Sequence, residues 1–190
     1  MATELSGIVA VGLIPKESPA QLKKGGKPIT LGMPKETSTE EKRVVLSPEA
    51  VRILSQNGIE VLVETQAGER AKFSDQQFSD AGAKIAYSSK EVFAADVVVK
   101  VNAPTEEEIA DMGSGACLIS ALQLEKQESS YIQALNAKKI TALAFEYLED
   151  KVGGMPVVRA MSEIAGSTVM LIASEYLSSV NEGKGLILGG

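Results

Sequence analysis

Two cations of the sequence, Lys100 and Arg43, occupy positions from which α/β proteins commonly bind ligands. Lys100 lies near the carboxyl end of the β-branched run 97–101, and open α/β sheets bind ligands beyond the carboxyl ends of their strands. A lysine there can exchange protons with a substrate or donate a hydrogen bond to its carbonyl oxygen. Arg43 follows the polar segment 37–42, and an arginine can bind a carboxylate through two parallel hydrogen bonds. The plainer alternatives are a strand-end lysine that reaches solvent and a solvated loop arginine.

The composition excludes several other chemistries. The chain of 190 residues contains no His and one Cys, Cys117, so it can form no Ser-His-Asp triad, no Cys-His pair and no zinc site built on His or Cys. It can form no internal disulfide either, which fits a reducing compartment. We expect no metal site, and we interpret Cys117 as a buried small hydrophobe and the acidic run 106–108 as a solvated helix start.

The charge balance restricts the possible partners. Asp and Glu number 25 against 19 Lys and Arg, a net charge of −6, whereas nucleic acids and anionic membranes need a cationic face. The longest early apolar run, 7–15, is shorter than the roughly 20 residues of a membrane-spanning helix, and no basic region precedes it. We therefore expect a cytoplasmic protein with a small-molecule substrate and no nucleic-acid or membrane partner.

The elements that must position the two cations alternate between strands and helices. Strands are expected at 29–32, 59–64, 83–86, 96–101, 117–122 and 140–145. Helices are expected between Ser47 and Asn57, and at 75–81, 88–94, 105–112 and 127–138. This alternation, with mostly apolar and β-branched strands, predicts an α/β fold in which helices cover both faces of a parallel sheet.

A long apolar helix is expected over 162–180, beyond the glycine-rich turn at 152–156. At about 1.5 Å per residue such a helix is close to 30 Å long. Because it is apolar around most of its circumference, we expect a spine between two bodies rather than a surface helix. Residues 184–190 then begin an extended segment that ends in two glycines. We interpret this end as a truncation before a further domain, with a natural chain end as the alternative.

These features divide the chain into four parts. The first 28 residues carry four lysines against two glutamates and end in a lysine- and glycine-rich stretch, which is typical of a linker. The predicted division is an N-terminal arm at 1–28, a substrate or catalytic domain at 29–158, a linking helix at 159–183 and the start of a truncated domain at 184–190.

Short motifs surround both cations. In the first part of the chain they are Gly32-Met33-Pro34-Lys35-Glu36, Lys42-Arg43-Val44, Ser47-Pro48, Glu64-Thr65 and Ala67-Gly68. Further along they are Phe73-Ser74-Asp75, Ala81-Gly82-Ala83, Val99-Lys100-Val101-Asn102-Ala103-Pro104 and Met161-Ser162-Glu163-Ile164-Ala165-Gly166. In this order, from about Thr30 to the last residue, they resemble the alanine dehydrogenase and proton-translocating transhydrogenase family.

The resemblance implies a Rossmann-like substrate domain that faces a separate NAD-binding domain across a cleft. The family's dehydrogenases interconvert L-alanine, NAD⁺ and water with pyruvate, ammonium and NADH, and relatives form homo-oligomers. By position in the motifs, Arg43 would bind the substrate carboxylate, with Glu36 in support, and Lys100 would bind the substrate carbonyl or amine and move protons. Met161 and Ser162, at the start of the long helix, would contact the NAD cofactor, because a helix N-terminus suits an anion.

The sequence departs from the family pattern in two places. Gln123 stands where the alanine dehydrogenases compared carry a His; Gln can orient a pyruvate oxygen but has no titratable proton. We predict a catalytic and substrate-binding role for Gln123 beside Lys100, with a structural polar residue at a strand end as the alternative. The dinucleotide fingerprint G-x-G-x-x-G is absent from these residues. We therefore expect them, by themselves, to bind NAD weakly and to catalyse no alanine oxidation.

Three functions remain open. The leading interpretation is the substrate domain of an NAD-dependent alanine dehydrogenase, which the segment 162–166 favours. The second is the NAD(H)-binding alpha subunit of transhydrogenase, which the segment 101–104 favours. The third is a non-catalytic ligand-binding module that keeps the cleft without the chemistry, which the absence of the family His and of the cofactor domain favours.

Overall fold

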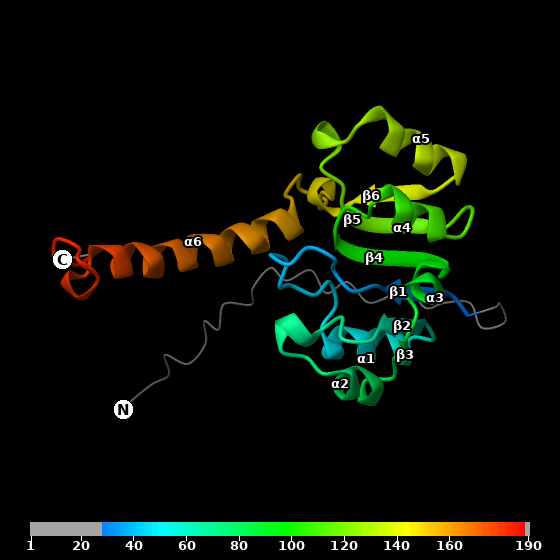
Figure 1. The fold of residues 1–190 in the computed structure, drawn as a ribbon, viewed down its shortest axis with the longest axis horizontal. Helices are drawn as coiled ribbons and strands as arrows, with labels where there is room; N and C mark the ends of the chain where they lie inside the picture. The colour runs from blue at the N-terminus through cyan, green and yellow to red at the C-terminus, as the bar shows by residue number, and fades with distance from the viewer. Residues whose placement is uncertain (1–27, 189–190) are drawn as a thin grey trace, which may run out of the picture.

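One parallel sheet forms the centre of the molecule. The computed structural model describes residues 28–188, so the predicted arm lies outside the described residues except for Pro28. The sheet is built from β1 (Thr30–Met33), β2 (Glu60–Glu64), β3 (Lys84–Ala86), β4 (Val97–Asn102), β5 (Cys117–Ala121) and β6 (Thr141–Ala144). Its six strands run in the order β3-β2-β1-β4-β5-β6 (Figure 1), and every neighbouring pair is parallel. The predicted α/β class is confirmed, and the order is that of a doubly wound Rossmann sheet.

Helices cover both faces of this sheet, as predicted. They are α1 (Pro48–Gln56), α2 (Asp75–Asp80), α3 (Ser89–Phe93), α4 (Glu106–Asp111) and α5 (Ser129–Ala137). Successive side chains of a strand point to opposite faces, and the neighbours Val98 and Val99 of β4 belong to two different apolar clusters. The cluster of Val99 includes Val51 of α1 and Phe78 of α2. The cluster of Val98 includes residues of α3, α4 and α5, so the two sets of helices lie on opposite faces.

The helix starts follow from capping residues that can be read in the sequence. Ser47 accepts a hydrogen bond from the backbone N–H of Ala50 and is followed by Pro48, which suits the first helical position. At the start of α4, the Thr105 side chain accepts from the N–H of Glu108 while the Glu108 carboxylate accepts from the N–H of Thr105. This reciprocal capping box fixes the Glu108 side chain next to the end of β4.

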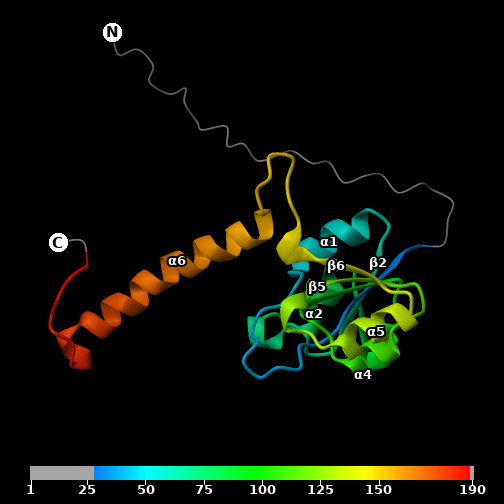
Figure 2. The same cartoon turned by 90° about the horizontal axis from the view of Figure 1, so that it is seen from above.

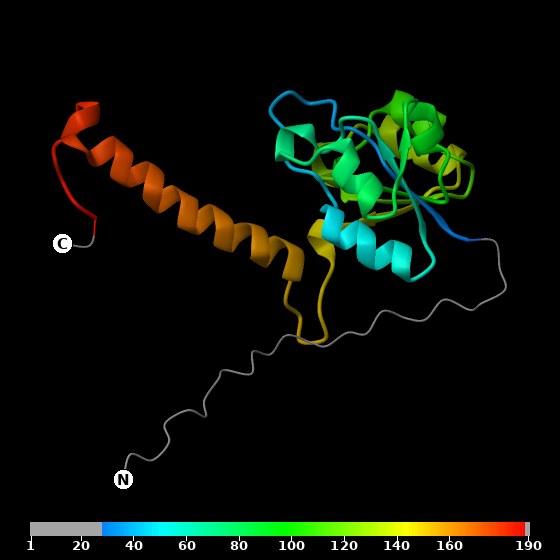
Figure 3. The same ribbon diagram turned by 90° about the horizontal axis from the view of Figure 1, so that it is seen from below.

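The long helix α6 (Pro156–Leu177) differs from the prediction in its start. It begins at Pro156 rather than Ser162, because a proline is compatible with the first helical turn. None of its residues is buried by the rest of the described chain, so the expected spine between two bodies stays a prediction. Figures 1, 2 and 3 show α6 extending away from the sheet and its covering helices.

The helix α6 is both exposed and apolar, which raises the question of whether it could cross a membrane. Among the described residues it is the one helix long and apolar enough to cross a membrane, with a mean hydropathy of 1.3 over its best window. Length and composition alone are a weak indication, since core helices of soluble proteins meet the same criterion. The Arg159–Glu163 ion pair adds two charges near its first turn.

Candidate functional site

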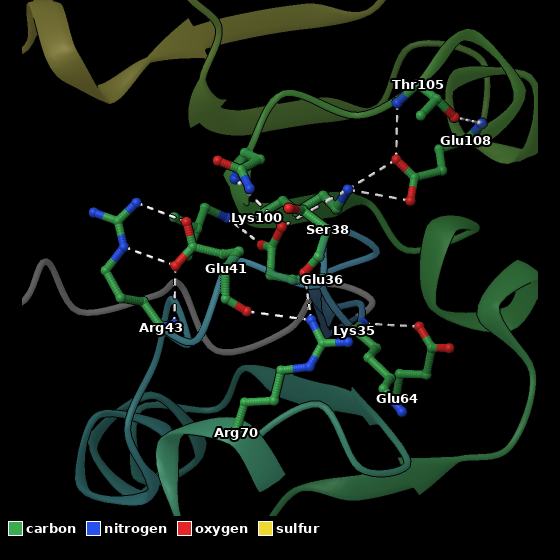
Figure 4. Close-up of polar contacts among 12 residues, drawn as sticks. Lys35, Glu36, Ser38, Glu41, Arg43, Glu64, Arg70, Lys100, Thr105 and Glu108 are labelled. Atoms are coloured by element: carbon green, nitrogen blue, oxygen red, sulfur yellow. Dashed lines mark hydrogen bonds and ion pairs between the residues drawn. The ribbon is translucent and has the colours of Figure 1, made fainter.

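The two predicted cations lie near the switch point of the sheet, between β1 and β4, where the direction in which the chain adds strands reverses. From β1 the chain proceeds outward to β2 and β3, and from β4 it proceeds to β5 and β6 on the other side. Connections that diverge in this way leave a crevice beyond the carboxyl ends of the two central strands. Arg43 lies in the segment that follows β1, and Lys100 lies within β4 (Figure 4).

Glu36 connects the segment after β1 to the end of β4. β1 pairs with β4 at Leu31–Val97 and Gly32–Val98, near the start of each strand. Further along, the Glu36 carboxylate accepts hydrogen bonds from the N–H groups of Val101 (2.6 Å) and Asn102 (3.4 Å). Burial raises the pKa of Glu36, partly offset by these bonds and by Lys100. The segment after β1 is therefore anchored to the end of β4.

Lys100 is a buried cation between two carboxylates. Its side chain is 1% exposed, and its Nζ donates to both oxygens of Glu108, at 2.9 and 3.1 Å. The Glu36 carboxylate lies 3.9 Å from the same Nζ. A strand-end lysine that merely reaches solvent is excluded, since a buried charge has to be paired.

Arg43 is held by a carboxylate that the sequence analysis did not identify. Its Nε and Nη2 donate to the two oxygens of Glu41, at 2.8 and 2.7 Å, and its backbone N–H donates to one of them at 2.9 Å. These bonds lower the pKa of Glu41 and raise that of Arg43. The signal was present in the sequence, because Glu41 and Arg43 carry opposite charges only two residues apart.

A chain of polar contacts joins the two cations. The Asn102 side chain hydrogen-bonds the carboxylate of Glu41, while its backbone N–H donates to Glu36, the neighbour of Lys100. Glu36 was expected to support Arg43. In the structure it contacts β4 and Lys100, and it acts on Arg43 through its charge alone. Figure 4 shows these side chains converging at the end of the sheet.

Gln123 follows the neighbouring strand β5 and has an unusual backbone conformation. Its φ of 46° lies in the left-handed region, and its N–H donates to the Glu146 carboxylate at 2.8 Å. The exposed side chain accepts a hydrogen bond from Lys126. Positive φ at a residue other than glycine costs free energy and is found disproportionately at functional sites. In the described residues no hydrogen bond joins Gln123 to Arg43 or Lys100, so its substrate role stays a prediction.

Met161 and Ser162 lie on α6, beyond its first turn. The sulfur of Met161 is 4.0 Å from Nη1 of Arg43, and both residues are exposed. Because the helix begins at Pro156, the predicted placement at a helix N-terminus is wrong, and the N–H groups of the first turn lie elsewhere. Met161 is nevertheless next to the candidate substrate arginine.

Two further features of the described chain concern metals and thiols. Within residues 28–188, no group of three or more His, Cys, Asp or Glu side chains is arranged to hold a metal ion. Cys117, predicted to be buried, is half-buried at the start of β5, and the burial raises the pKa of its thiol.

The pairing of Glu41 with Arg43 predicts a stability that depends on pH. Since the folded-state pKa of Glu41 is lowered, its stabilisation is present above the unfolded value of about 4.3 and is lost as the pH falls through the folded value. Arg43 is half-exposed, so we expect Glu41→Gln to lose about 1 kcal/mol or less at pH 7. Urea unfolding of both proteins should show this gap closing on acidification, whereas Glu40→Gln should show no such gap.

The strand order defines a Rossmann-type domain, with Arg43 in the segment after β1 and Lys100 near the end of β4. Residues 32–165 match the family model described as alanine dehydrogenase/PNT, N-terminal domain. The chain therefore belongs to this family.

Curated relatives and solved structures agree with this assignment. Alanine dehydrogenase 2 of Staphylococcus aureus is 36% identical over 160 residues, covering 84% of this chain and 43% of the relative. Alanine dehydrogenase of Staphylococcus epidermidis is 38% identical with the same coverage. A solved L-alanine dehydrogenase superposes with a TM-score of 0.79 at 35% identity, covering 85% of this chain and 45% of that one. The chain thus spans less than half the length of these relatives.

A solved transhydrogenase shares the fold to a lesser extent. The protein from Sinorhizobium meliloti superposes with a TM-score of 0.59 at 31% identity, covering 63% of this chain and 35% of the other. Both branches of the family are therefore structurally similar to this chain.

Proposed function

We propose that this chain is the substrate-binding domain of an NAD-dependent alanine dehydrogenase, which converts L-alanine, NAD⁺ and water to pyruvate, ammonium and NADH. The observation that carries the proposal is that one carboxylate, Glu36, links the two cations: it lies 3.9 Å from Nζ of Lys100, and its charge raises the pKa of Arg43. The named activity of the curated relatives supports it. We further propose a cytoplasmic protein, as the sequence analysis predicts, and a homo-oligomer, as the family resemblance implies.

The two cations suit different parts of a 2-oxo acid. The guanidinium of Arg43 is half-exposed and can accept a carboxylate oxygen on its remaining N–H groups. The ammonium of Lys100 can turn from Glu108 to the 2-oxo oxygen of pyruvate or the amine of alanine, and can give or take a proton there. Gln123 would orient the same oxygen. Glu36 and Glu108 keep a positive charge at Lys100 favourable in this buried position.

NAD is the cofactor that this function requires, and the described residues fit a contact with it rather than its main site. Met161 and Ser162 are exposed, and Met161 lies beside Arg43, so these two residues would contact the nicotinamide. When bound, NAD accepts the hydride. The phosphate-binding fingerprint is absent from this sequence, so we expect the main NAD site to be contributed by other residues.

Ligand binding by this chain tests the proposal. We expect pyruvate and its isostere oxamate to bind in the crevice, and Arg43→Gln to weaken both by about tenfold or more, because a charge-assisted pair of hydrogen bonds is lost. The measurement is a titration followed by ¹H–¹⁵N NMR. Arg159→Gln, at an exposed arginine on α6, is the matched control and should leave binding unchanged. Absence of binding, or equal binding by Arg43→Gln, contradicts the proposal.

The NAD(H)-binding subunit of transhydrogenase is the second candidate, and the superposition on the Sinorhizobium meliloti protein favours it. The two functions differ in one reaction. Alanine-dependent formation of NADH, by a protein that joins this chain to an NAD-binding domain, is expected of the dehydrogenase and not of the transhydrogenase.

A further inference from the structure

We infer that Glu41 is a positioning residue, which holds Arg43 by one edge of its guanidinium so that the other edge faces the substrate carboxylate. The inference rests on the proposed function, because it assigns Arg43 a carboxylate ligand. It adds a residue to which the sequence analysis gave no role.

The argument starts from the two forks of a guanidinium. The side fork consists of Nε and Nη2, and the end fork consists of Nη1 and Nη2. Both atoms of the side fork of Arg43 donate to the Glu41 carboxylate, at 2.8 and 2.7 Å. Nη2 carries a second hydrogen, and within residues 28–188 the hydrogen-bond contact of Nη1 is with the sulfur of Met161, at 4.0 Å. A thioether is a weak acceptor, so a carboxylate can take its place.

Glu41 is itself held from several directions. Its side chain is 9% exposed, and it accepts hydrogen bonds from the backbone N–H of Arg43 and from the side chain of Asn102. Its backbone carbonyl accepts from Nη1 of Arg70 at 3.3 Å, and the same nitrogen also donates to the carbonyl of Ser38. The carboxylate therefore has a fixed place relative to β4, and so does the guanidinium that it holds.

A different role would follow if Glu41 occupied the substrate's place. An internal carboxylate on the end fork would compete with the ligand, and its removal would tighten binding. The observed bonds lie on the side fork, and the Arg43 side chain remains 53% exposed. Removing Glu41 leaves Arg43 free to adopt many rotamers, and ordering it again on binding costs affinity.

The test compares Glu41→Gln with the wild-type chain in the oxamate titration. A glutamine oxygen can accept one of the two hydrogen bonds, whereas its amide group repels the other donor. We expect the dissociation constant for oxamate to rise about tenfold, as for the loss of a hydrogen bond between charged groups. The constant for oxamide, the uncharged diamide, should change much less. The Nε–H resonance of Arg43, protected from exchange by Glu41 in the wild type, should exchange faster in the variant without ligand.

The outcomes distinguish failure of the positioning role of Glu41 from failure of the proposed function. If the wild-type chain does not bind oxamate, the proposed function fails. If the wild type binds and Glu41→Gln binds equally well or more tightly, the positioning role is wrong while the proposed function stands. Glu41→Asp keeps the charge but shortens the reach, so its dissociation constant should lie between the two, and it replaces Glu41→Gln in the test should that variant unfold. Glu40→Gln, at an exposed neighbour, should bind oxamate as the wild type does.

Discussion

Lys100→Met is expected to lower the free energy of unfolding by about 3 kcal/mol at pH 7, because it leaves two carboxylates facing each other without their common cation. Lys100 is 1% exposed, and its partners Glu36 and Glu108 are 7% and 12% exposed. Water can therefore compensate little for the lost charge. Urea unfolding monitored by circular dichroism measures the effect. The loss should shrink on acidification, because burial raises the pKa of Glu36 and its protonation removes one of the two unpaired charges.

Two further variants show whether charge is the cause. Lys90→Met removes an exposed ammonium that lies 3.7 Å from Asp111, and an exposed pair of this kind contributes about 0.5 kcal/mol. The double variant Lys100→Met/Glu108→Gln lacks one of the two unpaired carboxylates. It should recover part of the free energy of unfolding lost in Lys100→Met, so the effects of the two substitutions should not be additive. Unfolding of Lys100→Met at the urea concentration of the wild type would mean that Lys100 does not neutralise this site.

The fold could be predicted from the sequence more fully than the site. Alternating apolar strands and capped helices determine the class and the approximate bounds, and the observed strands lie within a residue or two of those expected. Local patterns contain no information on strand order, because each βαβ unit can pack on either side of the previous one. The start of α6 was missed although Pro156 marks it, since the apolar periodicity is strongest further along the chain.

At the site, the sequence indicated the two cations but not the carboxylates that pair with them. A lysine at a strand end and an arginine in the loop after β1 were identified by position, and the structure pairs both with carboxylates. Glu108 was interpreted as part of a solvated helix start, and it does form the capping box. Its bond to Lys100 depends on how α4 packs beside β4, and no spacing in the sequence encodes that distance. Long-range pairs of this kind require the tertiary structure.

Gly32→Ala is expected to lower the free energy of unfolding by about 3 kcal/mol, because the new methyl group has no space. Gly32 lies in β1, at the centre of the sheet, on the side that faces α3. A Cβ at this position would overlap the backbone carbonyl oxygen of Val92, and a backbone atom cannot move aside as a side chain can. Overpacking of a close contact typically costs about 1–3 kcal/mol, and a rigid partner favours the upper end.

Gly166→Ala provides the matched control, because the same methyl group meets nothing within 4 Å there. Gly166 lies inside α6, where alanine is preferred over glycine by about 1 kcal/mol. Unfolding in urea should therefore show opposite signs for the two substitutions. A stable Gly32→Ala would mean that α3 can move away from β1. If Gly32→Ala is destabilised because β1 moves, the segment that follows β1 and carries Glu36 is displaced from the end of β4. We therefore expect a destabilised Gly32→Ala also to bind oxamate more weakly.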